Sequence, residues 1–166
     1  VEKFLLDRGA HLLAYVVHLV PAAKQQGHVL QRRDGGLDLP QADHRQQRAL
    51  QLADAHGRIM GIAHFNPHTL IAARMLSRDV TTIDAGFWHA RLLAATRLRD
   101  RLVDVPHYRL THAEADGTPG LIIDRFGDTV VVQANTAGMQ KAEADLLNAI
   151  ESVLKPSAIV WRGDTP

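Results

Sequence analysis

Two short apolar runs joined by a glycine-aspartate turn constrain the fold of this chain more than any other feature. Residues 120–125 and 129–134 are rich in aliphatic and β-branched side chains, and Phe126-Gly127-Asp128 connects them. A short turn of this kind between apolar runs is typical of a β-hairpin, because glycine adopts positive φ without steric cost. The sequence therefore predicts an antiparallel strand pair over this part of the chain.

The residues on either side of the hairpin complete a small α+β domain over 106–166. Apolar side chains recur every three or four residues from Met139 to Leu154, which predicts an amphipathic helix. Lys155-Pro156 ends that helix, because proline cannot continue it. His107–Thr111 and Ala158–Trp161 are predicted as further strands.

A linking helix is predicted within residues 80–105. Asp84 is a suitable N-cap, and Pro106 ends the segment. The apolar face is predicted to consist of Trp88, Leu92, Ala95 and Leu102.

Residues 51–79 are predicted to form a β-hairpin of a second, smaller domain. Arg58–Phe65 and Thr69–Leu76 read as strands around the turn Asn66-Pro67-His68. Residues 1–50 are left unassigned, except that the apolar spacing over Leu5–Val20 favours a helix. The polar stretch Gln41–Gln51 is expected to be a loop or a solvated helix.

Charge and cysteine content narrow the classes of function. Between Arg45 and Arg101 there are nine arginines, no lysine and four acidic residues, and an arginine-only segment suits contact with phosphate. A solvated charged face is the plainer interpretation. The chain has no cysteine, which excludes disulfides, thiolate zinc sites and a cysteine nucleophile within these residues. No apolar stretch is long enough to span a bilayer, so no membrane association is expected and a cytoplasmic protein fits.

Local motifs point to no catalytic, cofactor or metal site. The chain lacks the glycine-rich dinucleotide fingerprint, a Walker sequence and a nucleophile elbow. The histidines lack the partners of a zinc site. Two hypotheses exist for Glu114, Asp116 and Asp124: they form an acid-base or metal-binding cluster of a hydrolase, or they shape a turn before the hairpin, which we favour. The turn motif would comprise Glu114, Asp116, Gly117, Pro119, Gly120 and Asp124.

One run of residues is more specific. It comprises Tyr108-Arg109-Leu110 followed by Glu114-x-Asp116-Gly117-x-Pro119-Gly120-Leu121-Ile122-Ile123-Asp124-Arg125-Phe126-Gly127-Asp128. This run resembles the central domain of class I S-adenosyl-L-methionine (SAM)-dependent ribosomal RNA large-subunit cytosine-5 methyltransferases of the methyltransferase I type. Upstream, Gly57-Arg58-x-x-Gly61 and Phe65-Asn66-Pro67-His68-Thr69-Leu70 are similar to the end of that family's PUA domain. Phe87-Trp88, Thr136-Ala137-Gly138-Met139 and Arg162-x-Asp164 also fit, in the same order.

The resemblance implies a three-part enzyme, of which this chain holds the front. A PUA-like β-barrel would bind RNA, a central α+β domain would follow, and a Rossmann-like domain would bind SAM and carry the catalytic cysteine. We expect that last domain to be absent here, so the fragment alone is predicted to be inactive and to bind no cofactor. Residues 1–50 lack the family's opening Gly-His-Pro-Trp segment. We therefore expect a partial barrel, an altered N-terminus, and a non-native or disordered stretch before residue 51.

The residues predicted to contact ribosomal RNA lie around the basic hairpin. They are His64, Asn66, His68, Arg74 and Arg78. The alternative for Arg74 is a surface pair with an acidic residue. The alternative function is a stand-alone RNA-binding or dimerisation module, in which the hairpin Leu121–Ala134 would pair with a second copy. A hydrolase is the third hypothesis.

Overall fold

The computed structural model describes residues 2–6, 13–17, 28–31, 49–54, 56–66 and 69–163, the first three ranges as backbone only. The chain divides into two compact units, one of Val1–Ala22 with Arg48–Thr82 and one of Ala23–Gln47 with Ile83–Pro166. Helices and strands are mixed in the way that the sequence predicts for an α+β fold. Within the described residues no helix is both long and apolar enough to cross a bilayer.

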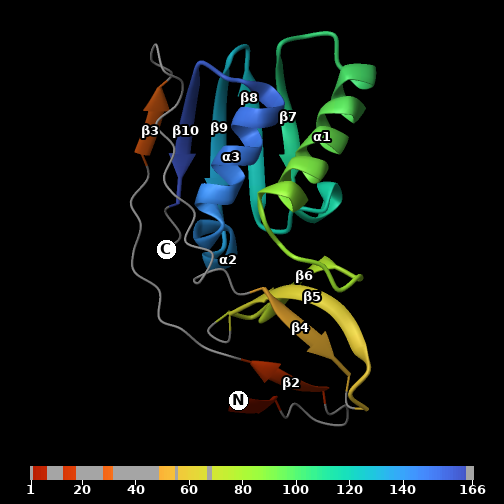
Figure 1. The fold of residues 1–166 in the computed structure, drawn as a ribbon. Coiled ribbons are helices and arrows are strands. Elements are labelled where there is room, and N and C mark those ends of the chain that lie inside the picture. Colours follow the sequence, from red (N-terminus) through yellow and green to blue (C-terminus); the bar gives the residue numbers. More distant parts are fainter. Residues whose placement is uncertain are drawn as a thin grey trace. The chain divides into compact units, whose positions relative to one another are not determined.

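The first unit is built from two antiparallel sheets (Figure 1). Strands β1 (Glu2–Leu6) and β2 (Leu13–Val17) form one, and β4 (Leu50–Ala53), β5 (Ile59–Phe65) and β6 (Ala73–Ser77) form the other. Strand β2 lies beside β4. No hydrogen-bonded ladder joins the two sheets among the described strands, so the expected partial barrel is not closed there. The small core of the larger sheet contains Leu52, Ile62, Ala63 and Leu76.

Two predictions for this unit are wrong. Residues 5–20 were expected to be a helix, yet β1 and β2 lie within and beside this range. An apolar run this short suits either element, and β-branched residues such as Val16 and Val17 favour the strand. The expected strand Thr69–Leu76 begins only at Ala73. The stretch Gln41–Gln51 falls mostly outside the described residues, but its last two residues belong to β4.

The second unit has one five-stranded sheet, in the order β3-β10-β9-β8-β7. The strands are β3 (His28–Gln31), β7 (His107–His112), β8 (Leu121–Phe126), β9 (Thr129–Ala134) and β10 (Ala158–Arg162). Strands β9 and β10 run parallel, and all other neighbours are antiparallel. The predicted hairpin is confirmed as β8 and β9, with Phe126 opposite Thr129 across the turn.

Helices α1 (Ala85–Leu102) and α3 (Glu143–Leu154) pack against each other on one face of this sheet (Figure 1). Alternate residues of β8 and β9 are buried, as a sheet covered on one face requires. The core of this unit includes Trp88, Leu92, Leu121, Ile123, Val130, Val132, Leu146, Leu147, Ile150, Ile159 and Trp161. Leu121, Ile123, Val130 and Val132 of the hairpin, which could have faced a second copy, are therefore buried inside the chain.

The predicted helix Met139–Leu154 is interrupted at Ala142. The short helix α2 (Ala137–Lys141) begins at the N-cap Thr136, whose hydroxyl accepts a hydrogen bond from the Met139 amide. Helix α3 then starts anew, and its C-cap Lys155 has a left-handed conformation at φ 45°. The predicted apolar face survives the break, because Met139, Leu146, Leu147 and Ile150 are all buried.

Helix α1 follows the prediction except at its end. Asp84 is the N-cap, and its carboxylate accepts a hydrogen bond from the Phe87 amide at 2.9 Å. Trp88, Leu92 and Ala95 are buried as expected, whereas Leu102 is 71% exposed. Beyond Ala95 the inward position of the next turn is taken by Arg99, which meets a polar turn and not an apolar core. The expectation for Leu102 is therefore wrong.

The N-cap of α1 offers a first test of this packing. Replacing Asp84 with alanine is expected to lower the free energy of unfolding by about 1 kcal/mol, because the amides of the first helical turn lose their acceptor. Replacing the exposed Asp100 in the last turn of the same helix is the control and is expected to change stability by less. Urea denaturation followed by tryptophan fluorescence measures both, and equal losses would contradict a capping role.

Candidate functional site

The hairpin β5–β6 carries most of the residues selected from the sequence for RNA contact. His64 of β5 lies opposite Arg74 of β6 in the strand register, so their side chains share one face of the hairpin. Both residues are half-buried, whereas Arg78, which follows β6, is exposed. Asn66 begins the connecting loop, and His68 lies outside the described residues. The structure thus brings His64 and Arg74 together and leaves Arg78 four residues farther along the chain.

Hydrogen bonds join the described residues of the connection between β5 and β6, namely Asn66 and residues 69–72. The Asn66 amide donates to the Ala72 carbonyl at 2.7 Å and closes the loop. The Thr69 hydroxyl lies 3.1 Å from the Asn66 carbonyl and 2.9 Å from the Ile71 carbonyl, so it bonds within the loop as well. These contacts hold residues 69–71 in a bend, which is why the expected strand does not begin at Thr69.

The tip of this loop was missed by sequence reasoning. Leu70 is 98% exposed and Ile71 is 55% exposed, although both belong to an apolar run that suggested a strand. The available signal was the turn sequence Asn66-Pro67-His68-Thr69, whose last residue can bond locally to the backbone.

The first unit is basic over the hairpin. Residues 56–78 contain three arginines, three histidines and no acidic residue. Arg58 is bound to Asp54, with 2.6 Å between Nε and Oδ2. Hydrogen bonds from the Arg58 amide and then from its side chain hold the pKa of the Asp54 carboxyl below its ordinary value. Arg74 and Arg78 on β6 and just beyond it are the arginines nearest the loop in sequence.

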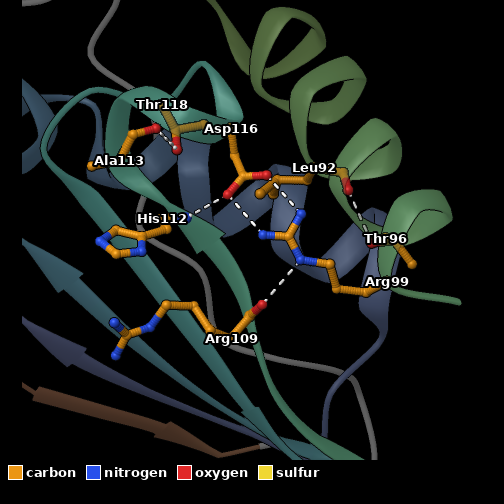
Figure 2. Close-up of polar contacts among 8 residues, drawn as sticks. All are labelled: Leu92, Thr96, Arg99, Arg109, His112, Ala113, Asp116 and Thr118. Carbon is orange, nitrogen blue, oxygen red and sulfur yellow. Dashed lines mark hydrogen bonds and ion pairs between the residues drawn. The ribbon is translucent and has the colours of Figure 1, made fainter. Parts of the chain in front are cut away.

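A second polar cluster lies in the other unit, where the turn before β8 meets α1 (Figure 2). Arg99 of α1 binds Asp116 of the 3-10 turn η1 (Ala113–Asp116) through two parallel hydrogen bonds of 2.7 and 2.8 Å. The Arg99 Nε donates to the Arg109 carbonyl at 3.2 Å, and the His112 amide donates to Asp116 Oδ2 at 2.7 Å. The cluster therefore joins the end of α1, strand β7 and η1.

The surroundings of Asp116 favour the ionised form of its carboxyl group. Burial raises the pKa of its carboxyl, but the hydrogen bonds from Arg99 and His112 and the positive charge of Arg99 lower it by more, so the net pKa lies below the ordinary value. A carboxylate with three donors and a low pKa is a poor general base at neutral pH. The geometry therefore argues against the acid-base hypothesis for Asp116.

The remaining turn residues differ in their surroundings, and one of them forms a side-chain hydrogen bond within the turn. Gly117 has φ 68°, and a Cβ placed on it would lie 2.4 Å from Nη1 of Arg91. The Thr118 hydroxyl donates to the Ala113 carbonyl at 3.2 Å (Figure 2). Pro119 and Gly120 are buried, and Glu114 is exposed.

Asp124 does not join Asp116 in one site. It binds Arg109 across the β7–β8 pair at 2.8 and 3.1 Å, and this hydrogen bond raises the pKa of the Arg109 guanidinium. Each of the two carboxylates is thus held by a different arginine. Among the residues described, no group of three or more His, Asp or Glu side chains is placed to hold a metal ion.

Comparison with known proteins finds a family match and similar sequences for this chain. Residues 25–78 match the family model of a PUA-like domain, a range that includes β3 to β6. Over 119 residues the chain is 36% identical to ribosomal RNA large subunit methyltransferase I of Erwinia tasmaniensis and 34% identical to the protein of that name from Shigella dysenteriae. The chain is homologous to part of ribosomal RNA large subunit methyltransferase I. Each match covers 69% of this chain but only 30% of the relative, so the chain spans about a third of their length.

A solved structure shows the same fold at lower identity. A protein from Streptococcus mutans, proposed to be a SAM-dependent methyltransferase, superposes with a TM-score of 0.62 over 83% of this chain and 39% of its own. The sequences are 16% identical, so this likeness concerns the fold alone.

Proposed function

We propose that this chain is the RNA-binding and RNA-positioning segment of a SAM-dependent methyltransferase that modifies cytosine-5 in large-subunit ribosomal RNA. The observation that carries the proposal is the homology to ribosomal RNA large subunit methyltransferase I together with the match to a PUA-like domain. The first unit would bind ribosomal RNA in the cytoplasm. The second unit would join that binding module to the remainder of the enzyme.

The basic hairpin supports the assignment of RNA contact to the first unit. His64 and Arg74 lie side by side on β5 and β6, and Arg78 is exposed just beyond β6. Arginine and histidine side chains suit the phosphates and 2′-hydroxyls through which folded RNA is recognised. We propose His64, Asn66, His68, Arg74 and Arg78 as the contacting residues.

We further propose that the 166 residues of this chain by themselves bind no SAM and transfer no methyl group. A cysteine that attacks the base would have to come from residues outside this sequence, because the chain has none. Asp116 and Asp124 are each committed to an arginine and are not available as acid or base. Equilibrium dialysis of the chain with labelled SAM is expected to detect no binding.

A stand-alone RNA-binding or dimerisation module is the alternative. Self-association through the hairpin β8–β9 is disfavoured, because Leu121, Ile123, Val130 and Val132 are at most 1% exposed within a single chain. Sedimentation of the chain tests the dimerisation form of this alternative: a monomer that binds ribosomal RNA contradicts it, and a dimer that binds none supports it.

The salt dependence of RNA binding tests the proposed function directly. Large-subunit ribosomal RNA is titrated with the chain over a range of salt concentrations. Replacing Arg78 with glutamine is expected to weaken binding several-fold and to reduce the slope of log affinity against log salt by about one, because one phosphate contact is lost. The exposed Arg97 of α1 is the matched control, and its replacement by glutamine is expected to leave the slope unchanged. Absence of RNA binding by the unaltered chain would overturn the proposal.

A further inference from the structure

The loop between β5 and β6 presents an apolar tip in an otherwise basic hairpin. Leu70 is 98% exposed and Ile71 is 55% exposed. Single exposed aliphatic residues are ordinary on protein surfaces and carry no meaning by themselves. Two features set this pair apart, namely the hydrogen bonds of the described residues next to it and the charge of its surroundings.

The first feature is that hydrogen bonds hold the described residues on both sides of the tip. The Asn66 amide donates to the Ala72 carbonyl at 2.7 Å, and the Thr69 hydroxyl lies within hydrogen-bond distance of the Asn66 and Ile71 carbonyls, to either of which it can donate. A group that is already fixed loses little conformational entropy on binding, so its apolar area contributes more fully to affinity. Leu70 and Ile71 are therefore exposed next to a hydrogen-bonded segment of backbone.

The second feature is that the chain around the tip is cationic. Residues 56–78 hold three arginines and three histidines and no acidic side chain. Arg74 lies two residues after the loop closes at Ala72, and Arg78 is exposed four residues farther on. An apolar point flanked by arginines is complementary to a polyanion that also has apolar faces, and nucleic acids combine phosphates with flat bases in this way.

We propose that Leu70 and Ile71 form an apolar wedge that packs against unstacked bases of RNA, while Arg74 and Arg78 contact the neighbouring phosphates. This inference rests on the proposed RNA-binding function and adds a base-contacting element to it. The wedge contributes burial of apolar surface and not charge, so its energetic signature differs from that of the arginines. A groove on another protein and an anionic lipid surface are the competing binding partners of the tip.

Photo-crosslinking from the tip tests the contact without knowledge of the RNA site. The full 166-residue chain carries p-benzoylphenylalanine in place of Leu70, and the control carries it in place of Leu98 of α1, which is 45% exposed. Both are irradiated with protein-free large-subunit ribosomal RNA. A crosslink to specific nucleotides from position 70 and none from position 98 is the expected result.

Affinity measurements separate the wedge from the phosphate contacts. Leu70→Ser is expected to weaken RNA binding on the order of tenfold, as loss of a buried aliphatic side chain implies, with an unchanged salt slope. Leu98→Ser is expected to change neither quantity. Because Leu70 has almost no contacts within the chain, its replacement is expected to leave the circular dichroism spectrum unaltered.

The outcomes distinguish the wedge from the function on which it rests. If the chain binds RNA but position 70 does not crosslink, or crosslinks no more than position 98, the wedge is overturned and RNA binding stands. If Leu70→Ser leaves RNA affinity unchanged but abolishes binding to anionic phospholipid vesicles, the tip is a lipid contact and the proposal also fails. If the unaltered chain binds no RNA, both proposals fall together.

Discussion

Replacing Gly61 with alanine is expected to unfold the larger sheet of the first unit. Gly61 has φ 141°, and a Cβ placed on it would lie 2.1 Å from the Ser77 carbonyl oxygen and 2.9 Å from the Arg78 Cα. Both obstacles are backbone atoms at the end of β6 in the same chain, so neither can rotate away while β5 and β6 remain paired. Backbone strain and overpacking together are expected to lower the free energy of unfolding by roughly 3 kcal/mol or more.

Gly57 provides the matched control for this prediction. Its φ of 79° is also unfavourable for alanine, but nothing lies within 4 Å of a Cβ at that position. Gly57→Ala is therefore expected to cost about 1 kcal/mol, the conformational penalty alone. Hydrogen exchange of the β6 amides measures both variants. Fluorescence of Trp88 and Trp161, which both lie in the second unit, is expected to stay native, and equal protection of β6 in the two variants would contradict the steric argument.

Replacing Asp116 with asparagine is expected to destabilise the second unit strongly. The side chain of Asp116 is 8% exposed and that of its partner Arg99 is 15% exposed. Removing one member of such a pair leaves the other charge half-buried and uncompensated, at a cost on the order of 2 kcal/mol. The His112 amide also loses its charged acceptor. Urea denaturation followed by tryptophan fluorescence measures the loss.

The exposed pair Arg109–Asp124 is the control. The Arg109 side chain is 44% exposed, so Asp124→Asn is expected to cost less than about 1 kcal/mol. If the two aspartate variants lose equal stability, burial does not account for the importance of the Arg99–Asp116 pair.

The pH dependence of stability gives an independent reading of the same pair. In the folded chain the pKa of Asp116 is lowered, since its hydrogen bonds with Arg99 and His112 outweigh the opposing effect of burial. The stabilisation from this lowered pKa is present above the unfolded pKa of about 3.9 and is lost as pH falls through the folded value. Asp116→Asn is therefore expected to flatten the acid limb of a plot of unfolding free energy against pH. An unchanged acid limb would contradict the assignment.

Local sequence determined the elements whose signals are complete within a few residues. The hairpin β8–β9 depends on two apolar runs and a glycine-containing turn, and the start of α1 depends on one capping side chain, Asp84. The buried stripe of α1 and the apolar face of α3 depend on periodicity alone, because residues three and four apart share a helix face. These features need no knowledge of what packs against them, so they could be predicted.

Tertiary structure decided the features that depend on distant partners. A helix was predicted over 5–20, but the described residues of this range belong to the paired strands β1 and β2. A short apolar run suits a helix or a strand, and the strand pairing decides between them. Leu102 is exposed because the inward position before it is occupied by Arg99, whose partner Asp116 lies 17 residues away in sequence. Leu70 and Ile71 lie at an exposed loop tip because Asn66 and Ala72 close the loop behind them. Composition and periodicity thus specified helices α1 and α3 and the strands from β5 onward, while tertiary pairing specified which polar groups are held inside and which apolar groups remain exposed.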